Sequence, residues 1–140
     1  MKEKLQQIAR NNGWSFDYGR DDYSNLERSE DKEFHLFLDP IEELVRFEEG
    51  AQEVGRTYSG RLLLLMVSDY DRVYDDQEGN IPSEGKYEKY IKRCKEEVMK
   101  IANAFCWEYD ILQWRMLEVI NLYDTNFDGV LVNFQITSSR

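Results

Sequence analysis

The stretch CWEYDILQWRMLEVINLYDTNFDGVLVNFQI, residues 106–136, decides the fold of this chain. After Gly129 the residues alternate between two sides, and one side holds only β-branched and aromatic residues: Val130, Val132, Phe134 and Ile136. A repeat of two of this kind is typical of a β-strand. Before the turn DTNFDG at Asp124–Gly129, the residues from Trp114 to Leu122 are also rich in apolar side chains. The stretch therefore predicts two antiparallel strands joined by a turn.

The same turn matches the first half of a calcium-binding loop. Asp124, Asn126 and Asp128 place oxygen-bearing side chains at alternate positions, and Gly129 would permit the sharp bend. The closing position needs a glutamate that binds through both oxygens, and the residue there is Gln135. The residues after the glycine also alternate as a strand does. We therefore expect a hairpin loop here and no specific calcium site.

The composition indicates one folded domain, residues 1–140. Hydrophobic residues make up 41% of the chain and aromatic residues 14%, which is too rich for a disordered segment and enough for a core. There are 28 acidic and 18 basic residues, which give a net charge of −10. Because affinity for nucleic acid comes mainly from Lys and Arg at the phosphates, this balance argues against specific nucleic-acid binding. It favours solubility or a basic partner.

The cysteines and the apolar runs exclude further classes of protein. Cys94 and Cys106 form no disulfide framework, and with the single histidine they cannot complete a zinc site without carboxylates. Residues 1–12 are charged throughout, so no signal peptide is expected. The longest apolar run, residues 62–67, is too short to cross a bilayer. The expected place of synthesis is the cytoplasm, with no contact to membrane.

Residues 2–12 predict a short helix, because Leu5, Ile8 and Ala9 fall on one helical face. Gly13 follows, at a position where the left-handed backbone of a helix end is common. Beyond it, alternating or continuous apolar runs separated by charged loops predict three strands: Trp14–Tyr18, Phe34–Leu38 and Gly60–Ser68. The last of these holds LLLLMV, a continuous run that is typical of a central strand covered on both faces.

A long hairpin that extends beyond the body is predicted in front of this central strand. Its arms are Ile41–Glu49 and Arg56–Ser68, and Gly50 and Gly55 bracket its turn. A short helical turn over Ile41–Phe47 is the alternative. The segment is strongly acidic and has few apolar residues.

Residues 86–105 predict the one long helix. A single apolar stripe runs along it through Tyr87, Ile91, Cys94, Val98, Ile101, Ala102 and Phe105. Polar loops flank the helix, and no repeat or linker interrupts the chain. The expected fold class is α+β: a mostly antiparallel sheet of four to six strands, with the long helix packed on one face and a short N-terminal helix.

Candidate catalytic groups are few. His35 is the only histidine, so a Cys-His or Ser-His pair would have to use it, but on a short strand a solvent-facing or hydrogen-bonded histidine is the expected reading. Asp69, Asp71, Asp75 and Asp76 would gather a magnesium ion only beside a phosphate-binding motif, and the chain has none. We therefore expect no enzyme activity, no catalytic or metal-binding residue and no cofactor.

Interaction residues are expected in two places. Leu44, Val45 and Phe47 are poor residues to leave in water among glutamates, so a neighbouring protein is expected to cover the hairpin. Tryptophan is common at interface anchors, although core positions are equally open for the two near the last hairpin. The candidate interface residues are Leu44, Val45, Phe47, Glu48, Glu49, Trp107 and Trp114.

The order of these elements resembles a known family. The segments that carry the resemblance are YSGRLLLLMVSDYD (Tyr58–Asp71), KYEKYIKRCKEEV (Lys86–Val98) and LEVINLYDTNFDGVLVNFQI (Leu117–Ile136). In this order, from Phe34 onward, the chain is similar to the small tail-terminator and neck-ring proteins of tailed bacteriophages, particularly those of Bacteroides-infecting phages, including the crAss-like group.

The resemblance implies a structural virion protein without enzymatic activity. It would form a homo-oligomeric ring, a hexamer or dodecamer, at the head–tail junction or tail end. Its neighbours would be phage neck and tail proteins such as the portal, an adaptor or the tail tube, and DNA would pass through the ring without specific binding. Two other classes stay open: a small acidic inhibitor or immunity-type protein that covers a basic partner, and a metal-dependent enzyme that uses Asp69, Asp71 and the loop at residues 124–128.

Overall fold

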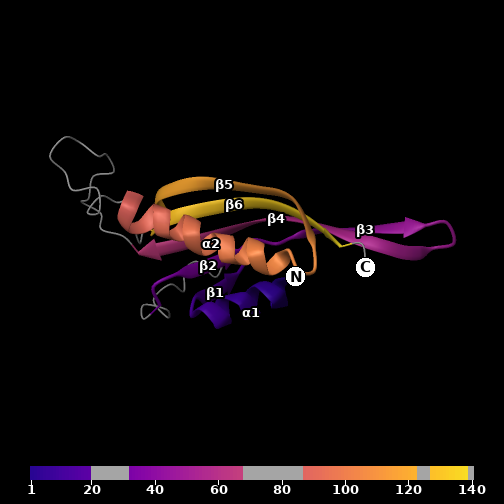
Figure 1. Cartoon of the computed structure of the whole chain (residues 1–140), viewed down its shortest axis with the longest axis horizontal. Helices are drawn as coiled ribbons and strands as arrows, with labels where there is room; N and C mark the ends of the chain where they lie inside the picture. Colours follow the sequence, from indigo (N-terminus) through magenta and orange to yellow (C-terminus); the bar gives the residue numbers. More distant parts are fainter. Residues whose placement is uncertain (20–31, 68–86, 123–126, 139–140) are drawn as a thin grey trace.

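Two helices pack on one face of a six-stranded sheet (Figure 1). The structure is a computed structural model and describes residues 1–19, 32–67, 87–122 and 127–138. The predicted α+β class is confirmed, since all strand pairs are antiparallel except β1–β2. The elements are α1 (Lys2–Asn12), β1 (Ser15–Tyr18), β2 (His35–Leu38), β3 (Glu42–Glu48), β4 (Gln52–Val67), η3 (Tyr87–Ile91), α2 (Lys92–Phe105), β5 (Asp110–Leu122) and β6 (Phe127–Ser138).

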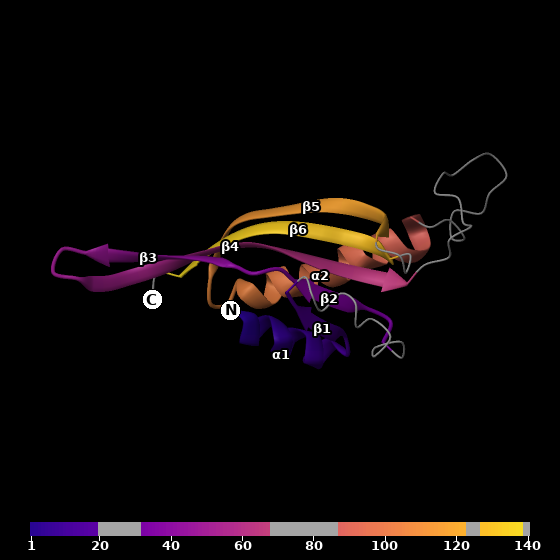
Figure 2. The same cartoon turned by 180° about the vertical axis from the view of Figure 1, so that it is seen from behind.

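Strand β4 organises the sheet, whose order is β1-β2-β4-β6-β5. Along one side β4 pairs with β6 from Arg56 to Val67. Along the other side it pairs first with β3 and then with β2, so that Ser59 lies opposite Glu42 and Leu62 lies opposite Leu38. Strands β2 and β3 thus follow one another along the same side of β4 (Figure 2). Asp39-Pro40 interrupts them, which fits a proline without a backbone donor.

The apolar run of β4 is covered on both faces, as predicted for a central strand. Leu62, Leu64 and Met66 join the main core between the sheet and the helices. Leu63 and Leu65 point to the far face of the sheet, where they pack with Phe37 and Phe127 in a second, smaller cluster. We call the side that α1 and α2 cover the helix face, and the other side the far face.

The last hairpin is confirmed as the antiparallel pair β5–β6. Its predicted bounds were partly wrong, because residues 106–108 form a turn before β5, and Asp128 and Gly129 belong to β6. Gly129 does not form the expected sharp bend. It allows β4 and β6 to approach closely, because a Cβ atom there would lie 2.2 Å from the carbonyl oxygen of Leu64. Asp124 and Asn126 lie outside the described residues.

The long helix begins with a π-helical turn, η3, that continues into α2. The predicted stripe is buried from Ile91 to Phe105, but at the start of the helix Tyr90 is buried and Tyr87 is only half-buried. A π-helical turn holds more residues than an α-helical turn, which rotates the earlier positions away from the stripe. Each large side chain that the stripe buries contributes about 1.5–3 kcal/mol before entropy is subtracted.

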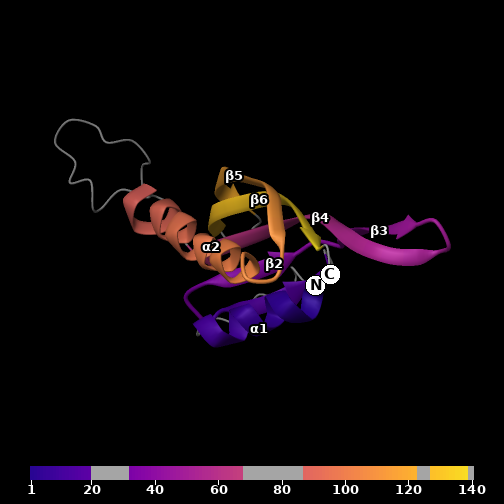
Figure 3. The same ribbon diagram turned by 45° about the vertical axis from the view of Figure 1, so that its right-hand side comes forward.

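The N-terminal helix α1 is confirmed and closes the same face of the sheet. Gly13 caps it in the left-handed conformation, with φ of 75°. Leu5, Ile8 and Ala9 are buried in the main core, and α1 lies beside α2 under the sheet (Figure 3). The two helices thus cover one face of the body, and the hairpin of β3 and β4 projects beyond it (Figure 1).

The predicted hairpin is confirmed as β3 and the first half of β4, and the alternative helical turn over residues 41–47 is wrong. Gly50 and Ala51 take positive φ values of 90° and 65° at its turn. Gly55, which was expected to bracket the turn, lies within β4. The hairpin extends beyond the body of the molecule (Figure 1).

Candidate interaction site on the hairpin arm

The projecting part of the hairpin, residues 42–59, is called the hairpin arm below. Strand β6 supports its root and ends at Ser138, which lies opposite Arg56. Residues 46–55 continue past this point as a ribbon of two strands. A two-stranded ribbon on its own is only marginally stable in water. The arm therefore needs contacts at its root, or along its sides, to hold one direction.

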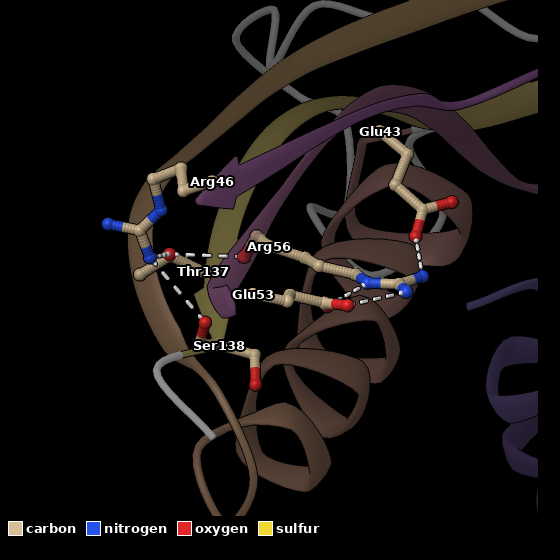
Figure 4. Close-up of polar contacts among 6 residues, drawn as sticks. All are labelled: Glu43, Arg46, Glu53, Arg56, Thr137 and Ser138. Atoms are coloured by element: carbon tan, nitrogen blue, oxygen red, sulfur yellow. Dashed lines mark hydrogen bonds and ion pairs between the residues drawn. The ribbon is translucent and has the colours of Figure 1, made fainter. Parts of the chain in front are cut away.

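Arg56 ties the two strands of the arm together on the helix face. Its Nε and Nη2 atoms donate hydrogen bonds to the Glu53 carboxylate at 2.5 and 3.2 Å, and Nη1 donates to Glu43 Oε1 at 2.6 Å (Figure 4). The hydrogen bond from Arg56 lowers the pKa of Glu53, and the two carboxylates raise the pKa of Arg56. Because Glu43 lies on β3 and Glu53 on β4, one guanidinium bridges both strands.

Arg46 ties the arm to β6 from the opposite face. Its Nη2 donates to Thr137 Oγ1 at 3.0 Å and to the carbonyl oxygen of Ser138 at 3.5 Å, and Thr137 in turn donates to the carbonyl of Arg56 at 3.1 Å (Figure 4). A glycine lies opposite Arg46 on β4: a Cβ at Gly55 would lie 2.6 Å from the Arg46 guanidinium and 2.4 Å from the Ser138 oxygen.

The two arginines hold the arm from both of its faces, since Arg46 and Arg56 belong to neighbouring cross-strand pairs. Charge-assisted hydrogen bonds are stronger and more directional than neutral ones. A register shift between Arg46 and Phe47 adds a bulge just beyond the root, and bulges bend and twist a ribbon. The arm is therefore a positioned element with a defined direction.

Two hollows flank the root of the arm. One, of about 340 Å³, is lined by Met1, Lys2, Tyr18, Ile41, Glu43, Arg56 and Tyr58. The other, of about 520 Å³, lies where Asp39-Pro40 interrupts the strands, and there Arg61 Nε donates to Asp39 Oδ2 at 2.6 Å. Burial raises the pKa of Tyr58, whose ring meets the edge of Tyr109. Both hollows are open and lined by polar groups, which suits a protein contact better than a small apolar ligand.

The structure brings five of the candidate interface residues together on the arm. Leu44 is 55% exposed and Phe47 is 64% exposed. Glu48 and Glu49 are exposed beside them, and Val45 is half-buried. Along β3, Leu44 and Glu48 alternate with Val45 and Phe47, so apolar and acidic side chains lie on both faces of the arm. This is the composition that the sequence indicated.

The two tryptophans lie on other elements. Trp107 is 86% exposed in the turn between α2 and β5. Trp114 is half-buried on β5, where its ring packs against Phe105 and Phe134. Trp114 therefore belongs mainly to the core, and Trp107 is the exposed one of the pair.

His35 makes the hydrogen-bonded contact that the sequence offered as one reading. The parallel pair β1–β2 places it opposite Ser15, and Ser15 Oγ lies 2.7 Å from His35 Nδ1. The imidazole is only 2% exposed and lies against the rings of Phe37 and Phe127. A Ser-His pair used for catalysis must meet a substrate, and this one is enclosed within the sheet. Sequence reasoning missed Ser15, because a parallel pairing between strands twenty residues apart leaves no local signal.

The candidate metal ligands gain no support in the described part of the chain. Asp69, Asp71, Asp75 and Asp76 lie outside the described residues, as do two residues of the calcium-like motif. Asp128 is fully buried in β6. Across residues 1–19, 32–67, 87–122 and 127–138, no three His, Cys, Asp or Glu side chains are grouped as metal ligands would be.

Cys94 lies in the core, as its place on the helical stripe indicated. Its thiol is 3.9 Å from the carbonyl oxygen of Asp128, and burial raises the pKa of the thiol. Cys106 is exposed. Within the part of the chain that the structure covers, no helix has the length and apolar character needed to cross a membrane.

Strand β5 carries a further surface that sequence reasoning missed. It forms one edge of the sheet, and several of its large apolar side chains are exposed: Leu112, Met116, Leu117 and Ile120. The pattern of this strand predicted only that it was a strand. The sequence did contain a signal for this surface: apolar residues fall on both sides of the strand. A strand with only one buried side needs apolar residues on that side alone.

Comparisons of the chain with protein-family models, curated proteins and solved structures find no match.

Proposed function

We propose that this chain is a structural protein of a tailed-phage virion that assembles into a ring at the head–tail junction or tail end. The observation that carries the proposal is the hairpin arm, which projects from the body and exposes Leu44 and Phe47. The resemblance in element order to tail-terminator and neck-ring proteins supplies the class. The proposal includes no enzymatic step, metal or cofactor.

The arm supports an assembly role for two reasons: its direction is held by side-chain contacts, and its apolar side chains are not covered within the single chain. Arg46 and Arg56 fix it before any partner arrives, which lowers the ordering cost of binding. Its apolar side chains remain in water in the single chain. Covering a residue such as Phe47 stabilises an interface by about 1.5–3 kcal/mol. A neighbouring subunit or an adjoining ring is the expected cover.

A ring follows when each subunit contacts the next by two different surfaces. Such head-to-tail contacts close when the rotation between subunits permits, and otherwise form a filament. The proposed partners are copies of this chain, as a hexamer or dodecamer, and neck or tail proteins such as the portal, an adaptor or the tail tube. The protein would be made in the bacterial cytoplasm and reside in the virion.

The charge of the chain is compatible with DNA passage. With a net charge of −10 the chain carries no general affinity for phosphates. A lumen with an acidic surplus repels the DNA backbone and lets it slide without sticking. This is why we propose passage of DNA without specific binding.

An inhibitor of a basic partner is the second candidate, and the exposed glutamates of the arm, Glu48 and Glu49, are the observation that favours it. The two functions differ in where the protein is found. Mass spectrometry of gradient-purified phage particles should detect this chain in a fixed ratio to the major tail protein. If the chain stays in the host lysate as a one-to-one complex with a basic protein and is missing from particles, the inhibitor is correct.

A further inference from the structure

Three strands of the sheet have a side with no strand partner among the described residues. They are β1 and β5, which end the strand order, and β3, which pairs only with β4. Strand β1 has only four residues, so β3 and β5 are the two long edges. An unpaired strand edge presents a row of backbone donors and acceptors that another strand can join. The two edges lie on opposite sides of the sheet, so one copy of the chain offers a different edge on each side.

The directions of the two strands suit copies that point the same way. Strand β3 is antiparallel to β4, β4 to β6, and β6 to β5, so β5 runs opposite to β3. When two copies stand side by side in one orientation, β5 of the first therefore meets β3 of the second as an antiparallel pair. All subunits of a cyclic ring share one orientation along its axis.

The lengths of the edges also match. Strand β3 has seven residues, Glu42–Glu48. The part of β5 between its two irregularities, Gln113–Val119, pairs residue by residue with β6 and is equally long. Strand β3 lies in the projecting arm, whereas this part of β5 lies in the body. Pairing them therefore shifts each copy along the strand direction relative to its neighbour. A stagger of this kind is what a closed sheet requires.

We propose that β5 of one copy pairs with β3 of the next, and that this pairing is the subunit contact of the ring; the proposal rests on the ring function above. The possible registers of this pairing differ by two residues, because a slip of one residue would turn the side chains of one strand to the opposite face of the sheet. The register that places Leu44 opposite Leu117 also places Val45 opposite Met116 and Phe47 opposite Trp114. It covers the two exposed apolar residues of β3, Leu44 and Phe47, and on β5 it covers Leu117 and Met116, which are 40% and 38% exposed.

The same register also decides which charges of the two strands meet. Glu118 lies opposite Glu43, but each carboxylate already has its own cation: Lys95 donates to Glu118 at 2.6 Å, and Arg56 donates to Glu43. The positive charge left on this stretch of β5 is Arg115. In this register Arg115 lies opposite Arg46, a like charge that weakens the pairing, and diagonal to Glu48, which is within reach of a long side chain across a strand pair.

Paired cysteines test the contact. We would place Leu44→Cys and Leu117→Cys together in the full chain, with Cys106→Ser to remove the exposed native thiol. Because the contact joins two different edges, mild oxidation should give a ladder of disulfide-linked multimers on a non-reducing gel. The matched control combines Leu44→Cys with Asn103→Cys, an exposed position on α2. A variant with only Leu44→Cys and a variant with only Leu117→Cys should form disulfide-linked dimers only when the two are mixed.

A band that stops at the dimer would indicate a two-fold contact, and a yield no higher than the control would show that these edges do not meet; either result overturns the proposal. Its failure is separable from failure of the proposed function. A chain that gives the ladder but is missing from particles keeps the pairing and loses the virion role. A chain present in particles without the ladder loses the pairing alone.

Discussion

The guanidinium of Arg46 donates a 3.0 Å hydrogen bond to the hydroxyl of Thr137, which lies 91 residues further along the chain. This contact joins the hairpin arm to the end of β6. Together with the bridge that Arg56 makes to Glu43 and Glu53, it gives the arm a direction before any partner binds. The predictions below begin from this relationship.

Arg46→Met should loosen the arm and leave the body intact. The substitution keeps the aliphatic stem and removes the donors to Thr137 and Ser138, so the two strands beyond Gly55 lose their tie to β6. Hydrogen exchange of residues 46–55 should become severalfold faster, while the melting temperature stays close to that of the parent. Arg10→Met, on the exposed side of α1, is the control. Equal exchange in both variants would show that Arg46 does not position the arm.

Acid should break the bridge between Arg56 and Glu53 on the helix face of the arm. The hydrogen bond from Arg56 lowers the folded-state pKa of Glu53 below its ordinary value of 4.5. Because the pKa is lowered, the contact stabilises the arm fully when the pH is above the ordinary pKa of a glutamate. This contribution is lost as the pH falls through the folded-state pKa of Glu53. An NMR titration of the Glu53 carboxyl group should show the low pKa, and Arg56→Met should return it to about 4.5. An unchanged pKa in the variant would refute the bridge.

Gly129→Ala should destabilise the protein by about 3 kcal/mol, because the new methyl group would meet the carbonyl of Leu64 and neither strand has room to move. Gly60→Ala is the matched control in the neighbouring strand. Its Cβ would lie 3.2 Å from the end of the Phe134 ring and 3.3 Å from Ile41. These side-chain atoms need to shift far less than the Leu64 carbonyl would at Gly129, so the change should stay within about 1 kcal/mol of the parent. Denaturant unfolding measures both. Equal losses would mean that the close approach at Gly129 is not real.

Ile101→Asp should prevent folding. Ile101 is fully buried on α2, and an unpaired carboxylate there loses its hydration without gaining a partner. Asn103→Asp, two residues along and exposed, should melt as the parent does. Circular dichroism on heating distinguishes them. A soluble Ile101→Asp variant with a normal transition would show that the stripe does not face the core.

The sequence predicted the helices and the strands well where hydrophobic periodicity extends over many residues. The stripe from Ile91 to Phe105, the run at Leu62–Met66 and the alternation after Gly129 are each repeated often enough to indicate one structure. Periodicity defined the ends of the elements less well than their centres. Asp128 and Gly129 resemble turn residues, and only their pairing with β4 shows that they belong to a strand.

The contacts that define the site could not be predicted, because they join segments far apart in sequence. The apolar residues among glutamates indicated that the arm was a surface, but nothing near Arg46 indicates Thr137. The same holds for Ser15 and His35, which a parallel pairing brings together. Strand β5 has apolar residues on both of its sides, but whether they are exposed depends on the order of strands in the sheet.

The most direct test of the central claim is cryo-electron microscopy of the phage particle. The ring account predicts that this chain can be traced into density at the head–tail junction or tail end. It should repeat around the particle axis, with the arm of each copy, residues 42–59, covered by a neighbouring subunit or an adjoining ring. A neck and tail fully explained by other proteins, with this chain absent from purified particles, would contradict it.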